Sequence, residues 1–291
     1  DVYKRQESAS IETLAKWLGC LGAASSPQGV DLMLVASRFY YQYPAQDDYE
    51  PQVDAEMWRE KIGSALDNIP LSVELHSGDP LRRILERLAE GKFDLVVTPI
   101  NDLDSRIMAE RLTRKSPVGV LAVTDDSKPA VSDVLVGVDF SDLSKLCLDW
   151  AEAFSTIGGD ESSRLEMMHL VDLPPRSRAT MAMTAEALAE QVHETATDAL
   201  NDLVTSHSRN PSKWEQKLVA GQWPGEALTR RASEGDFDLL VVGSHGRSAL
   251  TIALLGSHAS EVLRHCDRPV LVVKNKNENL QFVRGLLGLP N

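Results

Sequence analysis

Residues Glu234–Val241 read EGDFDLLV, and residues Glu90–Val97 read EGKFDLVV, so the chain carries one strand signature twice. The second copy is followed by GSHGRSALTIALLGS, a glycine-rich stretch that contains Gly243, Gly246 and Gly256 and ends at Ser257. The first copy is followed by PINDLDSRIMAER, which contains no glycine. We interpret the chain as a duplicated α/β unit in which only the second copy retains a glycine-rich loop.

The two copies also predict the domain boundaries. An offset of 144 residues relates Gly91–Val97 to Gly235–Val241, and an offset of 152 relates Ser116–Leu121 to Arg268–Val273, so the first copy lacks eight residues within its loop. Between the copies, residues 124–132 read TDDSKPAVS, which is typical of a linker. The predicted units are a first domain over residues 1–124, a second domain over residues 132–275 and a C-terminal tail over residues 276–291.

Composition excludes several classes of protein. The 291 residues are 43% hydrophobic and carry a net charge of −13, which indicates a packed core and argues against nucleic acid or an anionic membrane as partner. No apolar run is long enough for a membrane span, and we expect a cytoplasmic protein. The three cysteines have no CxxC spacing, so no metal site is predicted. The chain begins DVYKRQ without methionine, which we interpret as a fragment or as foreign leading residues.

The second domain alternates apolar strands with amphipathic helices. Asp133–Asp139 (DVLVGVD) is a continuous apolar run typical of a strand buried on both faces, and Ser141–Ile157 has helical spacing with Ser141 as N-cap. Strands are also predicted at Arg164–Val171, Trp214–Ala220, Phe237–Val242 and Pro269–Lys274, and helices at Thr184–Ser208, Pro224–Ser233 and Ser257–Arg264. Strands that alternate with helices pair in parallel, so we predict an α/β, doubly wound, five-stranded parallel sheet.

The first domain repeats this order from its first helix onward, so the fold class is two tandem doubly wound domains. A helix is predicted at Ile11–Gly22, and strands at Val30–Ala36, Leu71–Leu75, Phe93–Thr98 and Val118–Val123. No clear strand precedes that helix. Because the first strand is central in such folds, we expect the first domain to have a split sheet and interpret it as truncated.

The glycine-rich loop has the chemistry of a phosphate site. Gly243 and Gly246 allow positive φ and remove Cβ atoms, so backbone N–H groups are expected to stay free for an anion. Gly256-Ser257 then opens a helix, whose unpaired N–H groups and dipole favour phosphate. A turn followed by a capping Gly-Ser is the alternative. The stretch is neither a Walker loop, which needs Gly-Lys-Ser/Thr, nor the dinucleotide fingerprint, whose glycines follow the first strand.

The spacing G-x2-G-x9-G-S, with VGVDFSD, HLVD and RPVLVV in their places, resembles the universal stress protein family. The resemblance is strong over residues 132–275 and rests on pattern alone over residues 11–123. It implies strand order 3-2-1-4-5, as in adenine nucleotide alpha hydrolase-like folds, and a tandem member that acts in stress response. It also implies pairing of the two domains through their fifth strands as a pseudo-dimer within the chain, and allows a homodimer.

The resemblance further implies an ATP site above the first and fourth strands of the second domain. Mg²⁺ is an optional companion of the nucleotide, since the sequence offers no dedicated carboxylate for it. Asp139 would hold the ribose or lie by the adenine, and a helix cap is its alternative role. The remaining implied ligands are Val138, Leu170 and Val242 for adenine, Gly243, Gly246 and Gly256 for phosphates through their amides, and Ser257 for the terminal phosphates. Arg247, in the same loop, is a candidate for contact with phosphate or a partner subunit, with a solvated loop residue as the alternative. His258 stands next to Ser257 and either donates to phosphate or crowds it, so ADP or AMP remain alternatives to ATP.

Three further expectations concern activity and the rest of the chain. No catalytic residues are predicted, although slow ATP hydrolysis or autophosphorylation is an alternative, as is a scaffold that no longer binds nucleotide. The first domain is predicted to bind no nucleotide over Pro99–Arg106, because Pro99 lacks an N–H group and Asp102 and Asp104 add negative charge. Leu280–Leu289 has apolar residues at helical spacing, and is either a frayed end or a helix that packs on the first domain or a partner.

Overall fold

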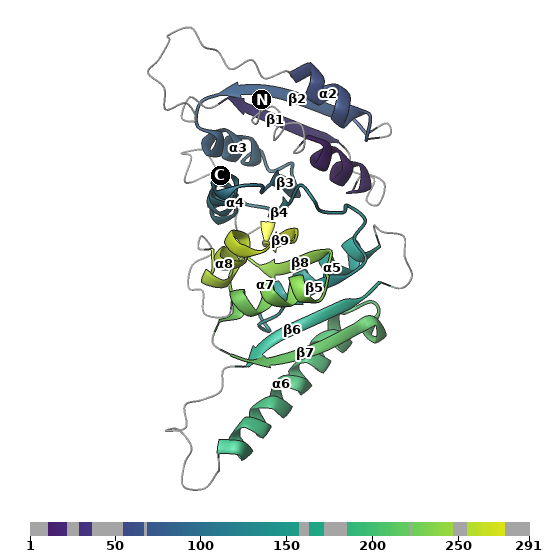
Figure 1. Ribbon diagram of the computed structural model, residues 1–291, viewed down its shortest axis with the longest axis vertical. Helices are drawn as coiled ribbons and strands as arrows, with labels where there is room; N and C mark the ends of the chain where they lie inside the picture. The colour runs from purple at the N-terminus through teal and green to yellow at the C-terminus, as the bar shows by residue number, and fades with distance from the viewer. Residues whose placement is uncertain are drawn as a thin grey trace.

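The computed structural model describes residues 11–21, 29–36, 55–66, 69–156, 163–171, 185–221, 223–246 and 255–276. Within these ranges helices and strands alternate along an elongated molecule (Figure 1). Two of the predictions above, the helix within Leu280–Leu289 and the role of Arg247, fall outside the described residues.

The helices and strands follow the predicted order in both halves of the chain. Before the linker lie a helix over residues 11–21, β1 (Val30–Ala36), α2 (Ala55–Gly63), β2 (Leu71–Ser77), α3 (Pro80–Leu88), β3 (Leu95–Pro99), α4 (Leu103–Lys115) and β4 (Gly119–Val123). After it lie β5 (Val134–Gly137), α5 (Asp142–Ser155), β6 (Leu165–Val171), α6 (Ala185–His207), η3 (Pro211–Lys213), β7 (Trp214–Ala220), α7 (Pro224–Glu234), β8 (Leu239–Gly243), α8 (Ser257–His265) and β9 (Val270–Val273). The predicted elements of the second half are all present, with ends displaced by a residue or two.

The sheet of the second half has the predicted order. Its strands lie β7-β6-β5-β8-β9, all parallel, which is 3-2-1-4-5 when counted from β5. Helices α5 and α6 contact the strands from one face, while α7 and α8 pack together on the other. After β5 the chain moves toward β6 and β7, and it later returns to the opposite side of β5 for β8. The order therefore reverses between β5 and β8.

Two hydrophobic cores explain why the strands read as continuous apolar runs. Successive side chains of a strand point to opposite faces, so Leu239 and Val241 of β8 join the core under α5. Leu240 and Val242 join the core under α7 and α8. Both faces of the sheet are thus covered, as expected of parallel strands.

The sheet of the first half is split, as predicted. β1 and β2 form a separate two-stranded parallel sheet, shown with α2 at the top of Figure 1. β3 and β4 instead extend the large sheet to seven strands, because β4 pairs antiparallel with β9. In this pairing Val120 lies opposite Val272, its own counterpart at the offset of 152 residues. The two halves therefore meet through equivalent strands.

The N-terminal helix, residues 11–21, packs against the core of the second half. Leu14 and Trp17 belong to the same hydrophobic cluster as the strands under α5. Trp17 Nε1 donates to Ser127 Oγ at 2.9 Å, and Thr13 Oγ1 donates to the carbonyl of Asp125 at 3.0 Å. The linker is thereby held by side chains of this helix. Among the described residues, none of the helices combines the length and apolarity that a membrane crossing requires.

Candidate functional site

A pocket of about 210 Å³ lies at the carboxyl ends of β5, β6 and β8, where the strand order reverses. It brings together most of the predicted site residues: Val138, Asp139, Leu170, Val242, Gly243, Gly246, Gly256 and His258. Ser257 is exposed at the first position of α8, between two lining residues, and does not itself line the pocket.

The floor and one wall of the pocket are apolar. Val138 and Val242 are buried at the ends of neighbouring strands, and Leu170 lies partly exposed at the end of β6. Met168 and Leu228 complete this surface, although neither was predicted from sequence. Leu228 comes from α7, whose approach depends on Gly137, because a Cβ there would lie 2.8 Å from Leu228 Cδ1.

Asp139 serves the start of α5, as its alternative interpretation stated. Its Oδ1 accepts from the backbone N–H of Ser141 at 3.1 Å and from Ser144 Oγ at 2.9 Å. Ser144 Oγ in turn accepts from the N–H of Asp139 at 3.0 Å. The carboxylate is therefore held rigidly at the pocket wall. A rigid carboxylate is compatible with a second role toward a ligand.

Ser141 is a pocket residue that sequence reasoning assigned only to helix capping. It occupies the N-cap position of α5, but its side chain makes no capping hydrogen bond. Its Oγ is buried and, among the described residues, has no hydrogen-bond partner. A buried hydroxyl without a partner is unfavourable. Because Ser141 lines the pocket, a bound ligand could supply the missing partner.

The glycines of the loop do not use the positive φ that was expected of them. Neither Gly243 nor Gly246 has φ in the left-handed region. They are required by close approach instead. A Cβ on Gly246 would lie 2.5 Å from Asp139 Oδ2, and one on Gly243 would lie 3.2 Å from Leu143 Cβ.

The expectation that the loop amides are free is wrong in part. The N–H of Gly256 donates to the carbonyl of Ser244 at 2.7 Å, and that of Ser244 donates to the carbonyl of Val273 at 2.9 Å. The start of α8 differs. Its first intrahelical bond runs from the N–H of Ser260 to the carbonyl of Gly256 at 3.0 Å, and Gly256 has no side chain that could cap. The amides of Ser257 and the next two residues thus have no acceptor within the helix.

Three imidazoles line this pocket. His169 Nδ1 lies 2.8 Å from the carbonyl of Val138, and because a carbonyl only accepts, Nδ1 carries the hydrogen. His169 is therefore held by the backbone through Nδ1. His245 Nδ1 lies 3.0 Å from Ser244 Oγ, and His258 is exposed at the start of α8. Among the described residues, no three His, Cys, Asp or Glu side chains are placed to hold a metal ion.

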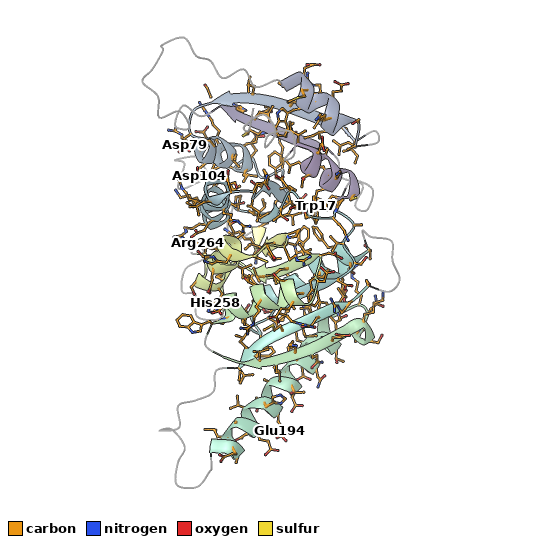
Figure 2. The ribbon with its side chains drawn as sticks, viewed as in Figure 1. Trp17, Asp79, Asp104, Glu194, His258 and Arg264 are labelled. Atoms are coloured by element: carbon orange, nitrogen blue, oxygen red, sulfur yellow. The ribbon has the colours of Figure 1, made fainter. Side chains whose placement is uncertain are left out.

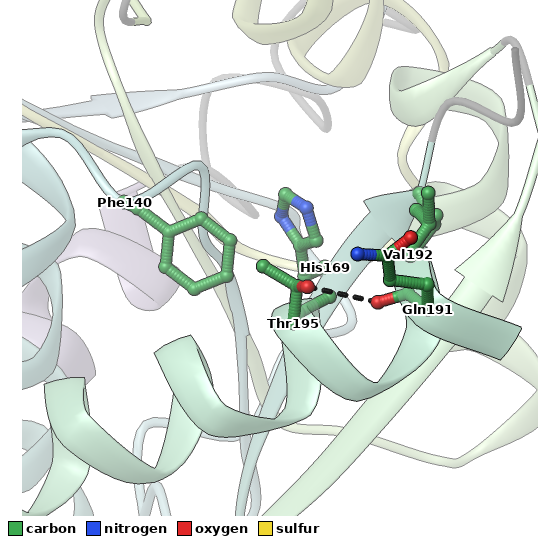
Figure 3. Close-up of a pocket in the computed structure, with 7 residues that line it drawn as sticks. Phe140, His169, Gln191, Val192 and Thr195 are labelled. Atoms are coloured by element: carbon green, nitrogen blue, oxygen red, sulfur yellow. Dashed lines mark hydrogen bonds between the residues drawn. The ribbon is translucent and has the colours of Figure 1, made fainter. Parts of the chain in front are cut away.

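A second pocket, of about 390 Å³, lies on the other side of His169, between β6 and α6 (Figure 3). Its lining comprises Phe140, His169, Val171, Gln191, Val192, Thr195 and Ala196. Phe140 adopts the left-handed conformation with φ of 62°, and its ring centroid lies 4.3 Å from that of His169. His169 thus separates the two pockets, an arrangement that local sequence signals did not reveal.

The corresponding helix of the first half, α4, is capped by side chains at its N-terminus. Ser105 N–H donates to Asp102 Oδ1 at 2.7 Å, and Asp102 N–H donates to Ser105 Oγ at 3.0 Å, which together form a capping box. Asp104 adds a further carboxylate in the first turn. The chain's own side chains therefore occupy the place that an anion would take.

These features together define the class of protein. A 3-2-1-4-5 sheet with a glycine-lined pocket at its strand-order reversal is an α/β protein of the doubly wound type. The sequence model of the universal stress protein family matches residues 131–274. Universal stress protein G of Shigella flexneri is 32% identical over 112 residues, which cover 37% of this chain and 78% of that protein. The chain belongs to the universal stress protein family.

Other relatives extend these similarities. A universal stress protein of Methanocaldococcus jannaschii is 26% identical over 155 residues, which cover 50% of this chain and 95% of that protein. A crystal structure of a functionally unknown protein of Pseudomonas aeruginosa has a TM-score of 0.64 at 17% identity, covering 92% of this chain and 89% of that one. The crystal structure of a universal stress protein of Archaeoglobus fulgidus has a TM-score of 0.59 at 17% identity, covering 90% of this chain and 93% of that one. The fold is therefore shared over nearly the whole chain.

Proposed function

We propose that the second domain, residues 132–275, binds an adenine nucleotide in the pocket at the ends of β5, β6 and β8. The ligand is ATP or its shorter relatives ADP and AMP, with Mg²⁺ accompanying the phosphates. The protein then acts in stress response as a nucleotide-dependent sensor or regulator. Membership of the universal stress protein family supports this role.

The chemistry of the pocket matches the parts of a nucleotide. The apolar surface of Val138, Leu170 and Val242 suits a planar base. The fixed carboxylate of Asp139 suits ribose hydroxyls, and two residues further on is the hydroxyl of Ser141, which has no partner in the part of the chain that the structure describes. The phosphates would then extend toward Gly256 and the start of α8, where backbone amides and the helix dipole favour negative charge.

One contrast carries the proposal. Helix α8 starts at the pocket with no side-chain cap, whereas its counterpart α4 is closed by the capping box of Asp102 and Ser105. An uncapped helix start normally costs stability, since side-chain capping contributes about 1 kcal/mol. A phosphate supplies the missing acceptors in α8. The first domain has no such vacancy and is proposed to bind no nucleotide over Pro99–Arg106.

A further part of the proposal concerns how the two domains of the chain associate. We propose that the two domains form a pseudo-dimer within the chain, paired through β4 and β9. The antiparallel pairing of Val120 with Val272, equivalent residues of the two copies, supports this arrangement. Analytical ultracentrifugation with and without ATP tests whether two chains associate further.

The decisive experiment removes one amide. Ser257 is the first residue of α8 and follows Gly256 at φ −61° and ψ 150°, so the backbone accepts proline there. Ser257→Pro deletes the N–H and the hydroxyl, whereas Ser257→Ala deletes only the hydroxyl. Leu103→Pro makes the same change at the first position of α4, which follows Asp102 in extended conformation, and serves as the matched control.

Isothermal titration with ATP, ADP, AMP and adenosine gives the readout. A hydrogen bond to a charged group contributes about 1.5–3 kcal/mol, so we expect Ser257→Pro to weaken ATP binding roughly tenfold or more. Adenosine binding and the Leu103→Pro chain are expected to match the wild type. A wild-type chain whose melting temperature does not rise with millimolar adenine nucleotide would leave the scaffold interpretation in place.

A further inference from the structure

Helix α8, whose start is the proposed phosphate site, also contacts the first half of the chain. It packs against α4 of the first half (Figure 1). Figure 2 shows His258 and Arg264 on α8 below the helix that carries Asp104. Two residues of α4, Arg106 and Glu110, make side-chain hydrogen bonds to α8.

Arg106 holds the C-terminal end of α8. Its guanidinium donates to the carbonyl of Leu263 at 3.1 Å and to that of Cys266 at 2.8 Å. The last carbonyls of a helix have no donors within the helix and carry the negative end of its dipole. A cation at this end therefore both satisfies the carbonyls and opposes the dipole.

Glu110 contacts the same helix in both its first and its last turn, through Ser260 and Arg264. Its side chain is almost fully buried and accepts from Ser260 Oγ at 2.7 Å and from Arg264 Nε at 2.6 Å. Burial on its own would raise the pKa of Glu110, but the hydrogen bonds from Arg264 and Ser260 hold that pKa below its usual value. Glu110 is thus a carboxylate at neutral pH. Ser260 is the residue whose N–H makes the first intrahelical bond of α8.

We propose that Arg106 and Glu110 are positioning residues for the nucleotide site, so that the first half of the chain, which keeps no phosphate loop, forms part of the site of the second. Arg106 holds the C-terminal end of α8, and Glu110 binds Ser260 and Arg264 along it. Together they fix the direction in which the amides that have no acceptor within the helix point. This inference rests on the proposed nucleotide function. By thermodynamic linkage, a bound nucleotide in turn stabilises the contact between α4 and α8.

The test compares the binding of ATP, which carries phosphates, with the binding of adenosine, which carries none. We expect Arg106→Gln and Glu110→Gln, each in the full chain, to weaken ATP binding about fivefold or more while leaving adenosine binding unchanged, because only the phosphates meet α8. Arg106→Lys retains a cation that reaches one carbonyl and is expected to restore part of the affinity. Arg83→Gln is the matched control, since Arg83 pairs with Glu86 on the exposed face of α3. Titration calorimetry gives both affinities, and thermal melting without ligand monitors folding.

The outcomes distinguish the possibilities. Wild-type ATP affinity in both variants would overturn the positioning role and leave the proposed function intact. Equal losses of ATP and adenosine affinity would also overturn it, because they indicate general damage to the domain. A wild-type chain that binds no adenine nucleotide would overturn the function first and the positioning role with it.

Discussion

Gly246 passes so close to Asp139 that a Cβ atom on the glycine would lie 2.5 Å from the carboxylate oxygen Oδ2. The loop after β8 and the turn after β5 are thus packed so closely here that no side-chain atom fits between them. The carboxylate cannot retreat freely, because its other oxygen is bonded to Ser141 N–H and Ser144 Oγ. The glycine is needed here for space rather than for a special backbone conformation.

Gly246→Ala is expected to destabilise the fold by about 1–3 kcal/mol, as is usual when an atom is forced into a packed site. It is also expected to weaken ATP binding, since Asp139 must move. Urea denaturation and ATP titration give the two readouts. Gly256→Ala is the control, because its Cβ would meet Ser244 O at an ordinary 3.4 Å. Equal stabilities of the two variants would contradict the close approach.

Two serines at the start of α5 are expected to contribute differently, Ser144 to the free energy of unfolding and Ser141 to nucleotide binding. Ser144 is buried and links to Asp139 through two hydrogen bonds, so Ser144→Ala should cost about 1 kcal/mol of unfolding free energy. Ser141→Ala should cost no stability, because its hydroxyl has no partner among the described residues, yet it should weaken nucleotide binding. Denaturation midpoints and ATP titration test the pair. A loss of stability in Ser141→Ala would show that its hydroxyl serves the fold.

Lys274 is expected to make stability depend on pH. Its ammonium group is buried between the halves, where Nζ donates to the carbonyl of Ser116 at 2.7 Å. Burial lowers the pKa of Lys274 from 10.5 to about 7. Between pH 7 and 10.5 the Lys274 amine is protonated in the unfolded chain but largely neutral in the folded one. The free energy of unfolding therefore rises with pH in this window, by up to roughly 1.4 kcal/mol per pH unit, and this gain is lost as pH falls to about 7.

Lys274→Met should therefore be more stable than the wild type at and below pH 7, and this advantage should shrink as pH rises toward 10.5. Chemical denaturation between pH 6 and 10 in ~1-unit steps measures the difference. Lys276→Met is the control, because Lys276 forms only a partly exposed pair with Asp94. A difference between Lys274→Met and wild type that does not change with pH would refute the effect.

Trp17 is expected to tie the N-terminal helix to the second half of the chain. The indole is fully buried in the cluster under α5, so Trp17→Ala should cost about 3–5 kcal/mol of unfolding free energy. Ser127→Ala should cost only about 1 kcal/mol, because it removes the hydrogen bond from Trp17 Nε1 and keeps the ring. Urea denaturation followed by circular dichroism compares them. Similar costs for both variants would show that burial of the indole contributes little.

Much of the fold could be predicted from residue patterns. Strands buried on both faces read as unbroken apolar runs, so β5, β8 and β9 were found to within a residue or two. The pocket residues Val138, Val242 and the loop glycines were also found, because they stand at positions that match motifs of the universal stress protein family. The split sheet of the first half followed from the missing central strand.

Other features of the site had no local signal. Leu228 reaches the pocket only because α7 packs over Gly137, and His169 separates two pockets only because Phe140 and α6 lie against it. The N–H of Gly256 could not be assigned to Ser244 from their spacing, since the bond depends on how the loop closes. Each of these contacts joins residues whose proximity no local periodicity encodes.

By itself, the sequence determined the two α/β copies and their doubly wound, parallel class, because periodicity and crossover handedness are local properties of the chain. The order of the strands, and with it the place where that order reverses, was implied by the family resemblance. Only the tertiary structure decided which loop amides near the pocket are bonded to the backbone and which helix of the first half holds α8. Those outcomes depend on the contacts of Arg106 and Glu110 with residues about 150 positions later, which no local pattern encodes. They follow from the pairing of β4 with β9, which brings α4 and α8 together.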